Sequence, residues 1–110
     1  MKKCFFAVAL IMASASVIAD MNSCIEISNF QRGTTCNNPA SASMRVTNVC
    51  SQSIDMQYCL KRANGTWDCG MAFNTAPGGS TTYYTCNGDM QGSYDYSARP
   101  AGSNERFPVH

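Results

Sequence analysis

The sequence predicts a small all-β domain, an antiparallel sandwich or barrel of about six strands cross-linked by disulfides. Short stretches of alternating apolar and polar residues recur about every ten residues, which is typical of half-buried strands. Turn-forming residues separate these stretches, and no segment after residue 19 carries a helical hydrophobic period. The cysteine count becomes even once an N-terminal leader is set aside, which indicates a disulfide-bonded exported domain.

The first 19 residues have the layout of a secretory signal peptide. A basic start, Met1-Lys2-Lys3, precedes an apolar run from Phe5 to Ala13, and Val17-Ile18-Ala19 ends in a small residue suited to signal peptidase. Ala13-Ser14-Ala15 is a second possible cleavage site. The apolar run is short for a membrane anchor, because a spanning helix needs ~20 apolar residues. We therefore expect a secreted or periplasmic protein with a single domain over residues 20–110 and no stable membrane anchor.

The charge balance argues against nucleic acid as a partner. The chain has 8 Lys and Arg residues against 7 Asp and Glu residues, and loss of Lys2 and Lys3 with the leader leaves 6 against 7, a formal net charge of −1. Binding to phosphate requires a clustered basic surface, which this composition does not supply. A domain of this size buries a modest core, so covalent cross-links contribute appreciably to its stability.

The first two strands are expected at residues 24–30 and 44–50. Ile25 and Ile27 face one side of the first strand, and Met44 and Val46 face one side of the second. The segment between them is rich in Gly, Thr, Asn, Pro and Ser, and therefore predicts a long loop.

A hairpin is predicted over residues 54–73. Alternating runs flank Asn64-Gly65, which is the strongest short-range hairpin signal. A two-residue loop would place Cys59 opposite Gly70. A three-residue loop, Ala63 to Gly65 with Gly65 left-handed, places Cys59 opposite Cys69. Opposed residues at a non-hydrogen-bonded site are ~4.5 Å apart between Cα atoms, at the low edge of disulfide reach. We predict a Cys59–Cys69 bridge.

Two more strands are expected at residues 80–87 and 93–98. Pro77-Gly78 supplies the turn before the first of them, because proline presets the corner and glycine accepts a positive φ. Asn87-Gly88-Asp89 supplies the turn before the second. Residues 107–110 are expected to pack as a tail. These patterns favour a sandwich or a small barrel but do not determine the strand order.

The six cysteines after the leader are expected to form three structural disulfides. Six cysteines allow fifteen pairings, and the sequence alone does not select one. Besides Cys59–Cys69, closure of the first long loop suggests Cys24–Cys36, which leaves Cys50–Cys86. Redox motifs and structural zinc sites place two cysteines about two residues apart, and this chain has no such pair. We therefore expect neither a metal nor a cofactor.

Catalytic groupings are sparse in this sequence. The single histidine is His110, the last residue, so a serine or cysteine triad would depend on a mobile terminal side chain. Asp55 and Asp68 lie on paired strands, where they could approach each other or face Lys61 and Arg62. Two acidic residues could form a glycosidase-type pair, and Asp89 with Asp95 could form a loose calcium site. The acidic residues considered are Glu26, Asp55, Asp68, Asp89, Asp95 and Glu105. Solvated strand faces and an ordinary turn explain them better, and we expect no enzymatic activity.

The aromatic residues are the most suggestive functional feature. Tyr83 and Tyr84 point to opposite faces of one strand, whereas Tyr94 and Tyr96 share a face of another. Some of these rings must fill the core, and others, together with Trp67, could form an outer patch. The main hypothesis is an exported, non-enzymatic module that binds an unknown protein or glycan through an aromatic strand face. Two alternatives are a structural or envelope-stress protein without a discrete ligand and a small hydrolase that uses two carboxylates.

Several motifs together resemble small exported six-cysteine proteins of bacteria. The motifs are Val46-Thr47-Asn48-Val49-Cys50, Tyr58-Cys59-Leu60, Gly65-Thr66-Trp67-Asp68-Cys69-Gly70, Pro77-Gly78 and Tyr84-Thr85-Cys86. The resemblance covers most of the chain after the leader. It implies a disulfide-bonded exported β domain, and it implies no activity, cofactor or site residue.

Overall fold

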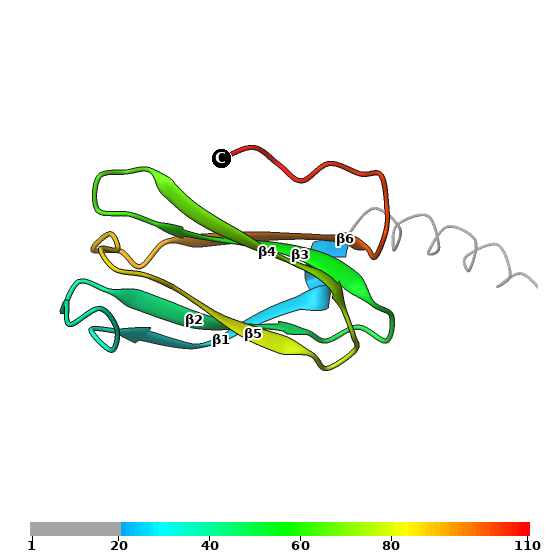
Figure 1. Cartoon of the computed structure of the whole chain (residues 1–110), viewed down its shortest axis with the longest axis horizontal. Helices are drawn as coiled ribbons and strands as arrows, with labels where there is room; N and C mark the ends of the chain where they lie inside the picture. Colours follow the sequence, from blue (N-terminus) through cyan, green and yellow to red (C-terminus); the bar gives the residue numbers. More distant parts are fainter. Residues whose placement is uncertain (1–20) are drawn as a thin grey trace, which may run out of the picture.

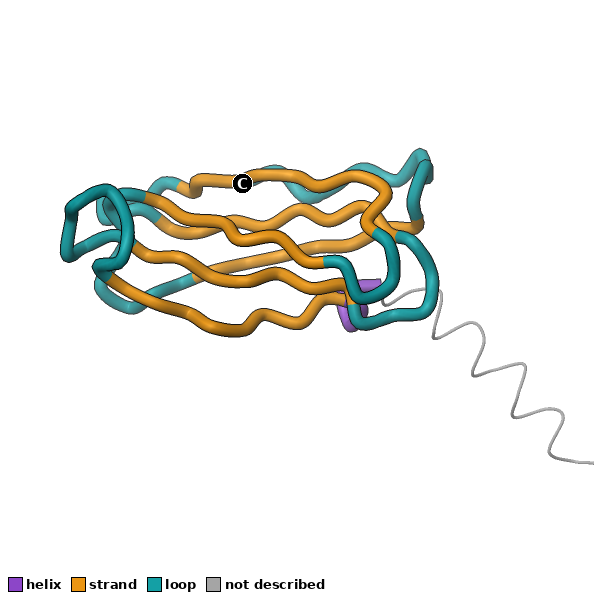
Figure 2. Tube along the Cα trace, turned by 60° about the horizontal axis from the view of Figure 1, so that its bottom comes forward, coloured by secondary structure: helices purple, strands orange, loops and turns teal. Residues whose placement is uncertain are grey.

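Six β-strands make up the domain in the computed structural model, which describes residues 21–110 (Figures 1 and 2). The predicted signal peptide lies outside the described residues. The elements are a short 3-10 helix, η1 (Met21–Cys24), and the strands β1 (Ile25–Arg32), β2 (Ala42–Asn48), β3 (Ile54–Lys61), β4 (Trp67–Thr75), β5 (Ser80–Thr85) and β6 (Tyr94–Pro100). All six predicted strands are confirmed, with their ends displaced by two residues or fewer.

The strands form two three-stranded antiparallel sheets that face each other as a sandwich (Figure 1). One sheet has the order β1-β2-β5 and the other has the order β4-β3-β6. The hairpins β1-β2 and β3-β4 each stay within one sheet, whereas β5 crosses over to lie beside β2 and β6 crosses back to lie beside β3. The predicted sandwich is therefore confirmed, and β2 and β3 are its central strands.

The hydrophobic core lies between the two sheets and is centred on β2 and β3. Met44 and Val46 from β2 pack with Ile54, Met56 and Leu60 from β3, and all five are almost completely buried. Alternation predicts burial on one face of each strand, and β2 largely follows this pattern. Every residue of β3 from position 54 to position 60 is buried, however, including the outward-facing ones. The outer face of β3 is covered by the segment after β6, which runs back across this sheet (Figure 1).

Tyr58 and Tyr83 pack between the sheets against Gly70, where their rings leave no space for a side chain. The Tyr58 and Tyr83 ring centroids are 5.0 Å apart, and Tyr58 lies opposite Gly70 in the β3-β4 register. A Cβ atom at Gly70 would lie 2.8 Å from Tyr83 Cε1 and 2.9 Å from Tyr58 Cε1. No larger residue fits at position 70 without displacing a ring, so glycine is needed here for space.

The predicted three-residue hairpin loop between β3 and β4 is confirmed. The Arg62 amide donates to the Thr66 carbonyl at 2.7 Å, the Gly65 amide donates to the Arg62 carbonyl at 2.9 Å, and Gly65 has a φ of 89°. This is the turn-plus-bulge geometry that places glycine at the left-handed position. The loop puts Cys59 opposite Cys69, and the two form a disulfide with a Cα–Cα distance of 4.0 Å.

The other two disulfide pairings expected from the sequence are wrong. Cys24 bonds to Cys50, and Cys36 bonds to Cys86. Because Ile25 pairs with Asn48 across β1 and β2, residues just outside these two strands meet at the same end of the sheet. At the opposite end, β2 pairs Ala42 with Thr85, which brings the β1-β2 loop to Cys86. Strand register, and not the closure of the nearest loop, selected these pairs.

Asn48 is a buried polar residue that ties the end of β2 to the β4-β5 turn. Its Nδ2 donates to the carbonyls of Gln52 and Thr75 at 2.9 and 3.0 Å, and its Oδ1 accepts from the Cys50 amide at 3.0 Å. Its backbone also pairs with the turn, since the Gly78 amide donates to the Asn48 carbonyl at 2.8 Å. Gly78 has a φ of 79°, as the Pro77-Gly78 motif predicts.

Truncation of a core methionine should destabilise the domain strongly. We expect Met56→Ala, which opens a cavity between the sheets, to lower the free energy of unfolding by about 2–5 kcal/mol. Met90→Ala is the matched control, because Met90 is 91% exposed, and it should change stability by no more than about 0.5 kcal/mol. Urea unfolding of the oxidised protein measures both values. Equal effects of the two substitutions would contradict this location of the core.

Candidate functional site

The segment after β6 forms a tail that crosses the outer face of the β4-β3-β6 sheet (Figure 1). This tail, residues 101–110, is held near its start by Arg99, whose side chain donates to the Glu105 carbonyl and lies 4.6 Å from the Phe107 ring centroid. Arg99 Nε also binds Asp55 Oδ2 at 2.9 Å. The tail expected at residues 107–110 is therefore confirmed and begins earlier, at residue 101, and it covers the outer face of the sheet.

Asp55 is the buried anchor of this arrangement. Its carboxylate accepts from the Asn74 amide at 2.8 Å and from the Gly102 amide at 3.3 Å, in addition to Arg99. Burial raises the pKa of Asp55, but the hydrogen bonds from Asn74, Arg99 and Gly102 and the charge of Arg99 outweigh it, so the pKa falls below its ordinary value of 3.8. One carboxylate therefore joins β3, β4, β6 and the tail.

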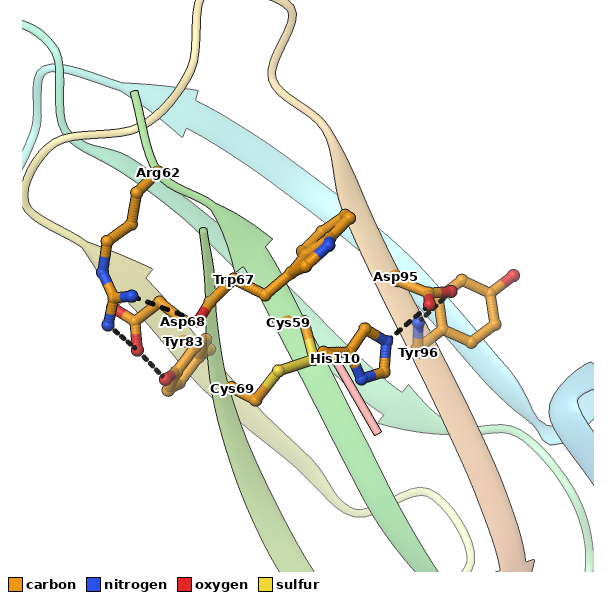
Figure 3. The surroundings of a disulfide bond; sticks show 9 residues. All are labelled: Cys59, Arg62, Trp67, Asp68, Cys69, Tyr83, Asp95, Tyr96 and His110. Carbon is orange, nitrogen blue, oxygen red and sulfur yellow. Dashed lines mark hydrogen bonds and ion pairs between the residues drawn. A yellow bond between two sulfur atoms is a disulfide. The ribbon is translucent and has the colours of Figure 1, made fainter. Parts of the chain in front are cut away.

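The other end of the tail places His110 beside the Cys59–Cys69 disulfide (Figure 3). His110 Nε2 lies 2.7 Å from Asp95 Oδ2, and its ring meets the Trp67 ring edge-on with 5.6 Å between centroids. The His110 side chain is 9% exposed. The terminal histidine contacts the sheet in this structure, because Asp95 pairs with Cys59 across β3 and β6 and so offers its carboxylate at this point.

Three potential metal-ligating side chains meet at this place. One donor atom from each of Cys59, Cys69 and His110 lies within 4.8 Å of the others. Thiolates ligate metals, and both sulfur atoms here are bonded to each other. The oxidised protein therefore offers a disulfide flanked by an imidazole, and a sulfur-and-nitrogen donor set would exist only after reduction.

A groove of about 510 Å³ runs between the tail and β4. Trp67, Met71 and Phe73 line it from β4, and Phe107 lines it from the tail. Met71 and Phe73 are 49% and 61% exposed. These two residues were not singled out from the sequence, although alternation from Trp67 places them on the same face of the strand.

The five candidate aromatic residues divide between the core and the surface, as expected, and lie in separate places. Tyr83 is in the core, and its hydroxyl donates to Asp68 Oδ1 at 2.6 Å; burial and then this carboxylate raise the pKa of Tyr83. Tyr84 is on the outer face of the other sheet, and Trp67 lies in the groove. Tyr94 and Tyr96 share a face as predicted, with 6.4 Å between stacked rings, and form a separate cluster with Phe30.

Asp55 and Asp68, which could have approached each other on paired strands, bind different partners. Asp68 lies 3.6 Å from Arg62, which confirms one expected contact. Asp55 binds Arg99 instead of Lys61 or Arg62. It faces the opposite side of the sheet from Asp68, and Lys61, which shares its face, lies at the other end of β3. At the turn considered for calcium, Asp89 accepts from the Ser93 amide at 2.9 Å. Asp95, the second residue of that possible site, binds His110.

No protein-family model, no curated protein and no solved structure matches this chain. The structure supports only the general feature of the resemblance noted above, namely a small β protein with six cysteines in three disulfides. Such a disulfide content is typical of an oxidising, extracytoplasmic compartment. Within residues 21–110, no helix is long and apolar enough to cross a membrane.

Replacement of Asp55 should make stability less dependent on pH in the acid range. A carboxyl group whose pKa is lower in the folded state contributes stability above its unfolded pKa, and this contribution disappears as the pH falls through the folded pKa. We expect Asp55→Asn to reduce the free energy of unfolding at pH 7 by about 1–3 kcal/mol, because buried donors lose their charged acceptor.

Chemical denaturation of wild type and Asp55→Asn at a series of pH values tests this expectation. The difference between the two proteins should shrink as the pH drops below 3.8, the ordinary pKa of this side chain. A difference that stays constant down to pH 2 would show that Asp55 does not titrate with a lowered pKa.

Proposed function

We propose that this chain is an exported, non-enzymatic binding module that engages a protein partner through the groove between β4 and the tail. The observation that carries the proposal is the exposure of Met71 and Phe73 on a concave surface. Large apolar side chains that are exposed next to one another on a small domain indicate an interaction site. The β4 side of the groove belongs to the β4-β3-β6 sheet and is cross-linked to β3 by the Cys59–Cys69 disulfide.

A protein partner fits this groove better than a glycan. Sugar binding would use the flat face of an exposed aromatic ring. The Trp67 ring makes a T-shaped contact with the His110 ring and has Lys61 Nζ at 5.5 Å from its centroid, and the Phe73 ring has the Arg99 guanidinium at 5.8 Å from its centroid. Methionine and phenylalanine are enriched in protein interfaces. β4 is an edge strand, so its outer side is available to an extended partner segment.

The charges at the groove indicate what such a segment carries. Arg99 and Arg106 line the groove together with the apolar residues. Arg99 is already paired with Asp55, so Arg106 is the arginine that we expect to meet a partner's charge. No acidic side chain is among the residues that line it. We expect the partner segment to combine apolar side chains with at least one carboxylate, because arginine recognises carboxylates through paired hydrogen bonds.

Gln57 gives further support for a ligand at this place. It lines the groove although it is only 6% exposed, and its Oε1 is buried without a hydrogen-bond partner. A buried acceptor that lacks a partner lowers stability by about 1–3 kcal/mol. A bound segment that shifts the tail and donates a backbone N–H group to Gln57 would recover this energy.

Selection from a displayed library of random peptides tests the proposal with the oxidised wild-type protein as target. Selected peptides should alternate apolar residues with acidic ones. Their affinity should drop by about 10-fold or more for Phe73→Ala, since central interface residues contribute over ~1.4 kcal/mol. Titration calorimetry provides the dissociation constants.

Tyr84→Ala is the matched control for that experiment. Tyr84 is an aromatic residue with 52% exposure on the outer face of the opposite sheet, so its truncation should leave peptide affinity unchanged. Peptides that respond to Tyr84→Ala and not to Phe73→Ala would reject the groove. Binding to a glycan array with no selected peptide would favour a glycan, and failure of both screens would favour the structural role. Turnover of a glycoside substrate that requires two of the carboxylates would indicate a hydrolase.

A further inference from the structure

The Cys59–Cys69 disulfide differs from the other two in its chemical surroundings. It joins β3 to β4 near the hairpin-loop end of the sheet and lies beside the chain's single histidine (Figure 3). Cys24–Cys50 joins the ends of β1 and β2, and Cys36–Cys86 joins a loop to the end of β5. A strand-to-strand disulfide is a structural cross-link by default, so an adjacent ordered imidazole suggests an additional role.

We propose that Cys59–Cys69 is a site of thiol–disulfide exchange at which His110 donates a proton to the leaving sulfur. The co-reactant is a dithiol, from either a small molecule or a protein. This inference concerns the disulfide itself and does not depend on the proposed peptide binding.

The two sulfur atoms have unequal access to an incoming thiol. Cys69 is exposed on the edge strand β4, whereas Cys59 is fully buried on the central strand β3. An external thiolate therefore reaches Sγ of Cys69. A bond forms between these two sulfur atoms, the Cys59–Cys69 bond breaks, and its electron pair passes to Sγ of Cys59.

The leaving sulfur needs a proton where it is formed. A thiolate buried away from water is unfavourable unless it is neutralised, and exchange is faster when the leaving thiolate is stabilised. The donor atom of His110 lies within 4.8 Å of both sulfur atoms, so a protonated imidazole can neutralise Cys59 as the bond breaks. Asp95 accepts a hydrogen bond from Nε2 and is a positioning residue that holds the ring in this place.

The second thiol of the co-reactant completes the exchange. It attacks the sulfur of the mixed disulfide that belongs to the co-reactant and releases Cys69 as a thiolate, which takes a proton from solvent. Two cysteine thiols are then formed on the protein, and the dithiol is oxidised to a disulfide. The reverse sequence reoxidises Cys59 and Cys69 at the expense of a disulfide on the partner.

The test is to reduce the folded wild-type protein with limiting dithiothreitol and to alkylate its thiols at intervals. Peptide mass mapping then measures the opening rate of each disulfide. Cys59–Cys69 should open about 10-fold or more faster than the other two, which act as internal controls in the same sample. A dithiol protein of the thioredoxin class, used in a parallel series, shows whether a protein or only a small dithiol is an effective co-reactant.

His110→Gln is the decisive variant, because glutamine can hydrogen-bond to Asp95 but cannot supply the proton. The opening rate of Cys59–Cys69 should fall about 10-fold or more, in the range of general acid catalysis, while the other two rates stay unchanged.

Three outcomes would overturn the proposal. The first is that all three disulfides open at similar rates in wild type. The second is an unchanged opening rate of Cys59–Cys69 in His110→Gln. The third is faster opening in this variant, which would show that the tail only shields the bond. Near-ultraviolet circular dichroism of the oxidised variant verifies that it is folded before the rates are compared.

Discussion

The buried ion pair between Asp55 and Arg99 holds the outer face of the β4-β3-β6 sheet in its observed form. Asp55 is on the central strand of that sheet, Arg99 is on an edge strand, and Gly102 brings the start of the tail to the same carboxylate. A charged group this deeply buried requires partners for its oxygens. The requirement places the tail over β3, and the tail in turn forms one wall of the groove and delivers His110 to the disulfide.

The small core explains why the remaining stabilisation is distributed among cross-links and polar contacts. Core residues come mainly from β2 and β3, and the peripheral strands contribute fewer fully buried side chains. Two disulfides close opposite ends of the β1-β2-β5 sheet, and the third joins the two strands of the β3-β4 hairpin. Asn48 connects the end of β2 to the β4-β5 turn. Its side-chain amide donates to the Gln52 and Thr75 carbonyls and accepts from the Cys50 amide.

One face of the molecule carries both proposed activities, and the two are physically connected through the tail. Met71 and Phe73 offer apolar area on one side of the groove, while His110 and Cys69 also line it. A segment that lifts the tail would move the imidazole away from the disulfide and alter access to the sulfur atoms at the same time. Ligand binding and disulfide chemistry would then influence each other, because both depend on the position of the same ten residues.

The sequence by itself determined the strands, the register of the β3-β4 hairpin and the Cys59–Cys69 disulfide. These features follow from short-range patterns: an alternation of period two sets each strand, and a three-residue loop ending in Gly65 sets the pairing of its neighbours. Tyr94 and Tyr96 were likewise placed on one face by spacing alone. The side chains of the groove were within reach of the same reasoning, because Trp67, Met71 and Phe73 alternate along one strand.

Only the tertiary structure decided the strand order, the other two disulfides and the site itself. Cys24 meets Cys50, and Cys36 meets Cys86, because of pairings among β1, β2 and β5 that join segments far apart in the chain. The burial of Asp55 and the ordering of His110 result from a tail that folds back over a sheet built earlier in the sequence. Local patterns specify which side of a strand a residue faces, but the free energy of packing distant segments determines what covers that side.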